Sequence, residues 1–299
     1  MKKGQLKEAV RNIKTWKKNG ERAPHKPLLI LYALGRVARG EPREMLYEDV
    51  KEDLRKLLVD FGPYRQFHSP CYPFVRLCND GFWKIRGKEI LHTKKNWSDK
   101  ELTENQTRGG FTEEVHDLLA GNQELLSEVA QIVLKDNFPG TLHEDILAQV
   151  GLDLEVTGTS TVPEGIIARS PDFRQRVLKA YEYRCAVCGF NVRLGDALVA
   201  VEAAHIKWHQ AGGPEHEQNG IALCSLHHKL FDRGVFTLDK EMVFQVAENA
   251  HGTHGMEEWL LCYHGQQVRS PVQPVYYPES EFINWHVKEV FKGPARWVS

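Results

Sequence analysis

The chain has 299 residues, of which 41% are hydrophobic and 26% are charged, proportions that exclude a disordered or fibrous protein. The length allows two domains that each bury a core. No long apolar run and no basic leader followed by an apolar run occurs, so we expect neither a membrane span nor a secretion signal, and we expect a cytoplasmic protein.

The net charge of −1 hides an uneven distribution of charge. Residues 1–110 contain 24 Lys and Arg against 14 Asp and Glu, a net charge of +10, whereas residues 111–160 have a net charge of −9. A basic segment rich in tyrosine and tryptophan is typical of phosphate binding, although basic helix faces are often only solvated. We therefore predict a DNA-reading domain at 1–110, an acidic helical connector at 111–164 and a second domain at 165–299.

The N-terminal segment opens with helices. Leu6, Val10, Ile13 and Trp16 recur at helical spacing, Pro27 can occupy the first turn of an apolar helix through residue 37, and residues 46–61 repeat the pattern. After residue 63 the chain becomes turn-rich and aromatic. Strand-like pieces at 74–77 and 82–85 flank an Asn-Asp-Gly sequence at 79–81, which predicts a short β-hairpin.

Three stretches of this segment resemble the sulfur-binding domain of phosphorothioate-dependent restriction endonucleases. They are Pro24-His25-Lys26-Pro27 with the apolar run after it, Phe61-Gly62-Pro63, and Tyr72-Pro73-Phe74-Val75-Arg76 followed by Asp80-Gly81-Phe82-Trp83. The resemblance implies a domain that recognises DNA in which sulfur has replaced a non-bridging oxygen of the backbone.

By this resemblance we expect six residues to contact the modified DNA: His25, Lys26, Tyr72, Pro73, Arg76 and Arg108. Sulfur is larger and less strongly hydrated than oxygen, so an apolar pocket formed by the Pro73 ring and the faces of Tyr72 and His25 would favour it. Lys26 would neutralise the adjoining phosphate. Arg76, or Arg108 in a mobile loop, would reach a guanine edge. From the residues alone, packing of a turn explains Tyr72 and Pro73 equally well, and a helix start explains His25.

The acidic segment predicts amphipathic helices at 112–138 and 141–150, and the composition of residues 156–165 is typical of a flexible linker. Ser170 as N-cap and Pro171 at the first helical position predict a helix over residues 170–183. This helix leads directly into a cluster of cysteine and histidine motifs.

Two metal-binding motifs, Cys185-Ala-Val-Cys188 and Cys224-Ser-Leu-His227, bracket the next forty residues. A single Cys-x-x-Cys pair is often a redox pair. A second motif at this separation instead favours one tetrahedral, structural Zn²⁺ held by Cys185, Cys188, Cys224 and His227.

Between and beside these motifs, His205, Asn219 and His228 resemble the three residues that name the HNH nucleases. The sequence pattern AAHI…NGIALC…HHKLFDRG resembles a branch of this family that is common in bacterial restriction enzymes. The resemblance implies a ββα-metal hairpin in which His205 is the general base, His228 is a metal ligand and Asn219 fixes the loop facing His205. Phosphodiester hydrolysis needs such a base and a cation, here Mg²⁺ or Mn²⁺.

The second protein ligand of the catalytic cation is the open point of this assignment. Many HNH proteins carry an acidic ligand immediately before the base, where this chain has Ala204. Asp232, four residues after His228 on the same helical face, is the candidate, although an aspartate at a helix end is more often a cap. Glu202 alternates to the strand face opposite His205 and is the weaker candidate.

The sequence thus predicts an α+β protein with a mainly helical DNA-reading domain that contains a short β-hairpin, followed by a zinc-stapled ββα-metal HNH nuclease domain. The expected function is restriction of phosphorothioate-modified double-stranded DNA. A methylcytosine-dependent HNH nuclease and a non-cleaving, zinc-containing regulatory DNA-binding protein are the alternatives. Cutting both strands would call for a homodimer or for two sequential binding events.

Overall fold

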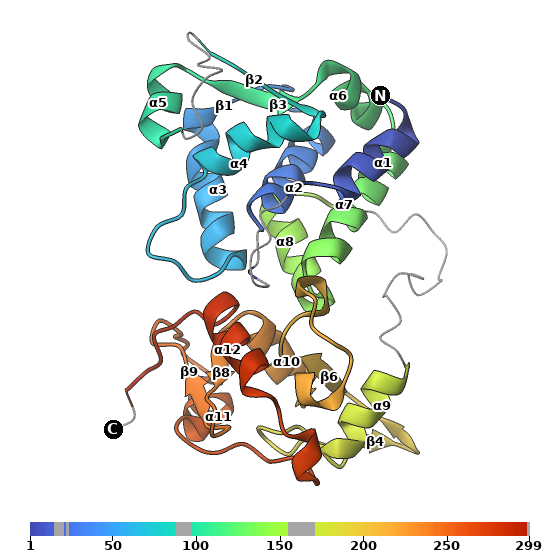
Figure 1. The fold of residues 1–299 in the computed structure, drawn as a ribbon, viewed down its shortest axis with the longest axis vertical. Helices are drawn as coiled ribbons and strands as arrows, with labels where there is room; N and C mark the ends of the chain where they lie inside the picture. The colour runs from blue at the N-terminus through green and yellow to red at the C-terminus, as the bar shows by residue number, and fades with distance from the viewer. Residues whose placement is uncertain (15–20, 22–23, 88–96, 155–170, 298–299) are drawn as a thin grey trace. The chain divides into compact units, whose positions relative to one another are not determined.

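The computed structural model describes residues 1–14, 21, 24–87, 97–154 and 171–297 (Figure 1). The chain divides into two compact units, Met1–Thr159 and Ser160–Ser299. In the described part of the chain, no helix is long and apolar enough to cross a membrane. Trp16, the linker expected at 156–165 and the N-cap expected at Ser170 lie outside the described residues.

The first unit is built around one buried helix. Helices α1 (Lys3–Arg11), α2 (His25–Ala38) and α3 (Tyr47–Phe61) correspond to the three helices predicted for this segment, but α1 ends before Ile13, which we expected to lie in it. Nearly every residue of α2 from Lys26 to Val37 is buried. A helix that is apolar on all sides must be covered on all sides, and α2 contacts α3, α4 (Cys71–Arg76), α7 (Gln123–Asn137) and α8 (His143–Val150).

A three-stranded antiparallel sheet in the order β1-β3-β2 completes the first unit, with β1 at Met45–Leu46, β2 at Trp83–Arg86 and β3 at Arg108–Phe111. The predicted hairpin around residues 79–81 is therefore wrong. Residues 71–76 form α4, and the 3₁₀ helix η1 (Leu77–Asp80) continues it to Gly81, whose φ is 83°. Strand β2 instead pairs with β3, so Arg108 lies in a strand and not in the mobile loop that we expected.

Aromatic packing explains why residues 74–77 do not form a strand. Pro73 lies in the first turn of α4, where a proline favours a helix start. The ring of Phe74 lies 5.0 Å from that of Tyr47 and 5.9 Å from that of Trp83, both edge-on, and the indole of Trp83 donates a hydrogen bond of 2.9 Å to the Phe74 carbonyl oxygen. The local alternation of residues is thus overridden by a tertiary aromatic cluster.

The acidic segment contains the predicted helices, but they belong to the first unit. Helices α5 (Asp99–Glu104), α6 (Glu113–Ala120) and α7 are followed by η2 (Gly140–Leu142) and α8. The single helix expected over 112–138 is broken at Gly121, and the side chain of Asn122 caps α7 by accepting from the Leu125 amide at 2.8 Å.

This packing corrects the connector expected at 111–164. Helix α7 lies against α1 and α2 and buries Leu126, Val129 and Val133, while the Arg39 guanidinium donates to the carbonyl oxygens of Val150 and Gly151 at 2.7 and 2.9 Å. An amphipathic helix can expose acidic residues on one face and bury apolar residues on the other. The sign of the charge therefore does not mark the domain boundary here.

The second unit is built around a β-hairpin followed directly by a helix. Strands β6 (Val201–His205) and β7 (Gly220–Cys224) are antiparallel, α10 (Ser225–Asp232) begins at the next residue, and α9 (Pro171–Ala180) packs against both strands. This arrangement confirms the predicted ββα element. The remaining elements are β4 (Arg193–Leu194), β5 (Ala197–Leu198), η3 (His209–Ala211), η4 (Glu217–Asn219), β8 (Phe236–Leu238), β9 (Phe244–Val246), α11 (Met256–Trp259), η5 (Leu261–Tyr263), η6 (Pro274–Tyr276) and α12 (Ser280–Glu289).

The close fit around β3 gives a test of the first unit. A Cβ at Gly110 would lie 2.1 Å from the carbonyl oxygen of Arg43, which is backbone and cannot move aside easily. We expect Gly110→Ala to destabilise the first unit by about 1–3 kcal/mol, the usual cost of overpacking. Scanning calorimetry of the full chain measures this. Gly140→Ala is the matched control because no atom lies within 4 Å of a Cβ there; an equal effect of both changes would contradict the packing described.

Candidate functional site

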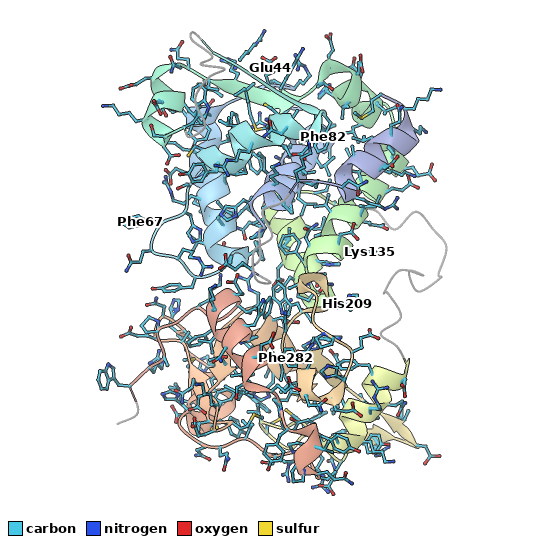
Figure 2. The ribbon with its side chains drawn as sticks, viewed as in Figure 1. Glu44, Phe67, Phe82, Lys135, His209 and Phe282 are labelled. Carbon is cyan, nitrogen blue, oxygen red and sulfur yellow. The ribbon has the colours of Figure 1, made fainter. Side chains whose placement is uncertain are left out.

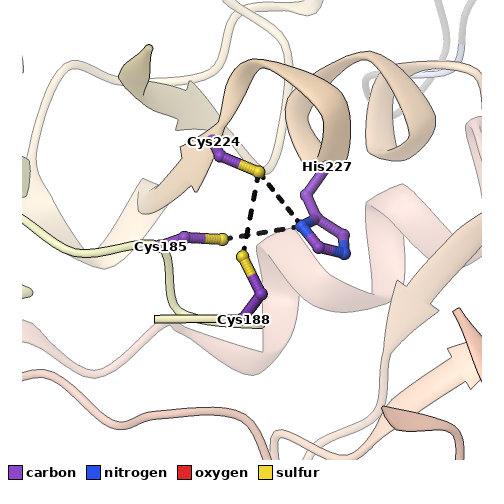
Figure 3. Close-up of side chains that lie close together, drawn as sticks. All are labelled: Cys185, Cys188, Cys224 and His227. Atoms are coloured by element: carbon purple, nitrogen blue, oxygen red, sulfur yellow. Dashed lines mark hydrogen bonds between the residues drawn. The ribbon is translucent and has the colours of Figure 1, made fainter. Parts of the chain in front are cut away.

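Four sulfur and nitrogen ligands meet at the start of α10. Cys185, Cys188, Cys224 and His227 bring one ligand atom each to within 4.8 Å of one another (Figure 3). The Nδ1 atom of His227 lies 3.2 Å from Sγ of Cys224 and 3.7 Å from Sγ of Cys185, and the Sγ atoms of Cys188 and Cys224 are 3.9 Å apart. The four residues predicted from motif spacing thus form one cluster, and a set of three sulfurs and one imidazole nitrogen fits Zn²⁺.

Local backbone structure holds each ligand of this cluster. Cys185 and Cys188 lie on a tight turn in which the Gly189 amide donates to the Cys185 carbonyl oxygen at 2.9 Å and Gly189 has a φ of 75°. Cys224 ends β7, and His227 lies in the first turn of α10. The Nε2 atom of His227 is 2.9 Å from the Trp259 carbonyl oxygen, so Nε2 carries the proton and Nδ1 faces the sulfurs.

The pKa of His227 reflects the charge of the surrounding sulfurs. Burial lowers this pKa, but hydrogen bonds to Cys185, Cys188 and Cys224 outweigh the burial and raise it to about 12. The same sulfurs that favour a positive charge on the imidazole would favour a metal cation in its place, because thiolates are preferred ligands of soft metals. The aromatic rings of Phe236, Phe244 and Tyr263 stand edge-on to the imidazole at about 6 Å and keep this side of the cluster apolar.

His205 lies at the end of β6, beside the hairpin loop. Its ring is 8% exposed and stacks on the ring of Phe173 in α9, with 4.2 Å between centroids and 15° between planes. In the strand register His205 pairs with Gly220, where a Cβ would lie 2.3 Å from Cγ2 of Val177. The strand pair and α9 therefore fix both the backbone and the ring plane of His205.

Asn219 ties the two ends of the loop between β6 and β7. Its side chain is fully buried; Oδ1 accepts from the Lys207 amide at 2.8 Å, and Nδ2 donates to the carbonyl oxygens of Lys207 and Pro214 at 3.0 and 2.9 Å. These bonds use both ends of the amide. Asn219 thereby holds together the two ends of the loop that follows His205.

His228 lies between two carboxylates. Its Nδ1 atom is 2.6 Å from Oε2 of Glu202, and its Nε2 atom is 3.2 Å from Oδ2 of Asp232. His228 and Asp232 are 1% and 3% exposed. An imidazole nitrogen and a carboxylate oxygen are donors that suit a hard divalent cation, and of the two carboxylates Glu202 is the more accessible, with its side chain 37% exposed against 2% for Asp232.

Glu202 lies closer to His228 than the sequence predicts. It points to the strand face opposite His205, as the strand alternation predicts. The opposite face, however, is the one covered by α10, so Glu202 reaches both His228 and Ser225, whose hydroxyl donates to Oε1 at 2.7 Å. The alternation of side chains along the strand, combined with the expected packing of the helix on the hairpin, is enough to place Glu202 against the helix that carries His228.

The six expected DNA contacts of the first unit differ in exposure. Tyr72, Arg76 and Arg108 are exposed, and the Arg76 guanidinium carbon lies 5.0 Å from the centroid of the Tyr72 ring. His25 is half-buried at the start of α2, and Pro73 is buried in α4. The apolar surface that the Pro73 ring was expected to offer therefore packs inside the unit.

Lys26 is committed to a buried ion pair. Its ammonium group lies 2.5 Å from Oδ2 of Asp80 and donates to the Lys14 carbonyl oxygen at 2.9 Å, and both side chains of the pair are at most 10% exposed. Lys26 thus joins α2 to η1.

Two exposed aromatic residues near α4, Tyr64 and Phe67, were not singled out from the sequence; Phe67 is 87% exposed and projects from the segment between α3 and α4 (Figure 2).

Comparison with protein families identifies both units. The family model described as the ScoMcrA-like DNA sulfur-binding domain matches residues 3–155, and the model described as HNH endonuclease matches residues 185–239. The first match extends from α1 through α8 and so includes the acidic helices. None of the curated proteins compared with the chain matches it.

Several solved structures are similar to parts of the chain. The sulfur-binding domain of SprMcrA complexed with phosphorothioated DNA has 26% identity and a TM-score of 0.43, over 51% of this chain and 95% of that one. The corresponding domain of ScoMcrA has 20% identity and a TM-score of 0.42, over 49% and 94%. The modification-dependent TagI restriction endonuclease has 24% identity and a TM-score of 0.30, over 40% and 37%. With TM-scores below 0.5, the family rests on the sequence matches.

The cysteine and histidine cluster gives a test by metal content. We expect Cys224→Ser to lower bound zinc from about one per chain to almost none and to destabilise the second unit, because structural zinc contributes directly to folding. Elemental analysis and calorimetry measure the two effects. The matched control is Cys262→Ser, an exposed thiol outside the cluster. Full zinc content in Cys224→Ser would show that the metal is held elsewhere.

Proposed function

The chain belongs to the ScoMcrA-like family of DNA sulfur-binding domains and carries an HNH endonuclease domain, and from this premise we propose that it is a phosphorothioate-dependent restriction endonuclease. The observation that carries the proposal is the pairing in one chain of a unit that reads a modified DNA backbone with a unit that has the HNH residues in a ββα element. Reading and cutting are then divided between the two units.

His205 acts as the general base of the cutting unit. The neutral imidazole of a histidine can accept a proton from the water that attacks the phosphorus. The stack on Phe173 and the bonds of Asn219 hold the imidazole and the neighbouring loop still, which keeps the entropy cost of reaching the reactive geometry low.

His228 and Asp232 would hold the catalytic cation, Mg²⁺ or Mn²⁺, which supplies positive charge for the scissile phosphate when it is bound. Cys185, Cys188, Cys224 and His227 would hold a structural Zn²⁺. The zinc ligand His227 and the cation ligand His228 are adjacent in α10, so the structural cluster also positions one residue of the cutting site.

The reading unit recognises phosphorothioate mainly through desolvation. Sulfur loses less hydration than oxygen when it is placed against apolar surface, and the exposed face of Tyr72 offers such surface. Arg76, held over that ring, and Arg108, on the exposed start of β3, are placed to contact phosphate or base edges. We assign Lys26 a structural role in joining α2 to η1, because Asp80 already neutralises its charge.

The substrate is double-stranded DNA, and cutting both strands requires either a homodimer or two successive binding events. The six cysteines form no disulfide, which suits a reducing cytoplasm.

Ala204 supports the alternative of a DNA-binding protein that does not cleave, because it leaves the position before His205 without a ligand.

The cutting assignment is tested by His205→Ala. This change should lower the rate of cleavage of phosphorothioate-containing plasmid by at least about 100-fold, because it removes the proton acceptor. Zinc content and DNA affinity should stay at the wild-type level, since His205 is not in the zinc cluster. His251→Ala, an exposed histidine in the same unit, is the control. Cleavage by His205→Ala at a near-normal rate would reject His205 as the base.

The reading assignment is tested by affinity for two duplexes that differ in one phosphorothioate linkage. In the full-length, cleavage-deficient His205→Ala background, Tyr72→Ala should lose chiefly the preference for sulfur because it removes apolar surface. Arg76→Ala should instead weaken binding to both duplexes and reduce the salt slope by about one phosphate contact.

Tyr277→Ala is the control for Tyr72→Ala, because the two tyrosines are 42% and 41% exposed and Tyr277 lies in the second unit. Equal affinities of the His205→Ala protein for the two duplexes would exclude sulfur reading. A selective response to methylated cytosine would favour the first alternative function.

A further inference from the structure

The outer face of the sheet in the first unit carries three basic side chains. Side chains alternate along a strand, and in β2 Lys84 and Arg86 are exposed whereas Trp83 is buried. Arg108 of β3 is also exposed, and it pairs with Arg86 in the strand register, so both arginines point to the same face. We call Lys84, Arg86 and Arg108 the basic sheet face.

Two members of the basic sheet face stand directly opposite each other. Arg86 and Arg108 are paired across neighbouring antiparallel strands, where Cβ atoms are about 5 Å apart and like charges destabilise the sheet. Lys84 is paired with Gly110, which has no side chain and so adds no counter-charge. An anion that binds this face would relieve the repulsion between the two arginines.

The carboxylates near these cations are already shared or paired. Oε2 of Glu44 lies 2.5 Å from the Arg86 guanidinium, and Oε1 lies 2.9 Å from that of Arg43. Glu114, which is close enough to Lys84 to interact with its charge, forms an ion pair of 2.8 Å with the N-terminal ammonium. Within the described part of the chain, the other two members of the basic sheet face form no ion pair. The face therefore keeps a net positive charge.

Helix α4 packs against the opposite face of the same sheet. A Cβ at Gly109 would lie 2.7 Å from the ring of Phe74, and that ring stands edge-on to Trp83. Helix α4 also carries Tyr72, to which we assign the preference for sulfur. Because the basic sheet face lies on the side of the sheet away from α4, the phosphates within its reach are not the one that α4 reads.

We propose that the basic sheet face binds unmodified phosphates of the DNA backbone and supplies affinity that does not depend on sulfur, while α4 supplies the preference for sulfur. This inference rests on the proposed function for its ligand, double-stranded DNA. Clustered cations without counter-charges suit backbone binding, because each phosphate contact releases counterions condensed on the DNA. Arg108 then contacts a phosphate and not a base edge.

The test is the salt dependence of DNA binding by the full-length, cleavage-deficient His205→Ala protein. Its ligands are two duplexes of about 30 base pairs, roughly 100 Å long, that differ in one phosphorothioate linkage. We expect Lys84→Gln combined with Arg86→Gln to weaken binding of both duplexes by about 10–60-fold at about 0.1 M salt and to lower the salt slope by about 1.8, at about 0.9 for each lost phosphate contact. The ratio of the two affinities should stay at the parent value.

Single changes and controls separate charge from structure. Lys84→Gln alone breaks no ion pair within the described part of the chain and should lower the slope by about 0.9, whereas Arg86→Lys keeps the charge and should keep the slope. Lys100→Gln changes an exposed lysine of α5 whose ammonium lies 3.7 Å from Glu104, and it should leave affinity and slope unchanged. Tyr72→Ala should change the affinity ratio and not the slope, because it removes no charge. A calorimetric transition at the parent temperature establishes that each variant is folded.

An unchanged salt slope in the double variant would overturn the proposal. A loss of affinity confined to the phosphorothioate duplex would do the same, because the basic sheet face would then belong to the sulfur reader. An equal loss in Lys100→Gln would reduce the effect to net charge and would also overturn it. Equal affinities of the parent protein for the two duplexes would instead reject sulfur reading, and the salt slopes would still decide the role of the basic sheet face.

Discussion

The joint between β7 and α10 is the constraint on which the cutting unit depends. Cys224 is the last residue of the strand and His227 lies in the first turn of the helix, so a metal held by both fixes the angle between the two elements. The same angle brings His228 to Glu202 on β6 and keeps His205 at the far end of that strand. A metal bound by this cluster would therefore determine where His205 and His228 stand relative to one another.

Hydrogen bonds and ring stacking hold the three histidine rings of the cutting unit in place. The imidazole of His227 is held by a backbone carbonyl, that of His228 by Glu202, and the ring of His205 by stacking on Phe173. Each histidine thus has a defined ring plane before any substrate arrives. Such preorganisation matters more for a phosphodiesterase than extra binding contacts, because little covalent chemistry is left for the protein to perform.

Short-range motifs could be predicted from the sequence, and contacts between distant segments could not. The cysteine and histidine cluster follows from spacings within fifty residues, and the ββα element follows from the resemblance of the same stretch to HNH nucleases. The strand pairing of residues 83–86 depends on β3, and the packing of Phe74 on Tyr47 and Trp83 overrides the local turn signal. The burial of Lys26 depends on Asp80, fifty-four residues away, and the acidic helices join the first unit through their apolar faces. In each of these incorrectly predicted regions, the local structure depends on a contact with a residue far along the chain.

The most direct test of the account compares cleavage of two plasmids of identical sequence, one with phosphorothioate linkages and one without, by the purified full-length chain with Mg²⁺ or Mn²⁺. We expect the modified plasmid to be cut and the unmodified plasmid to stay intact. Equal cutting of both plasmids, or cutting of neither with zinc bound and the protein folded, would contradict it.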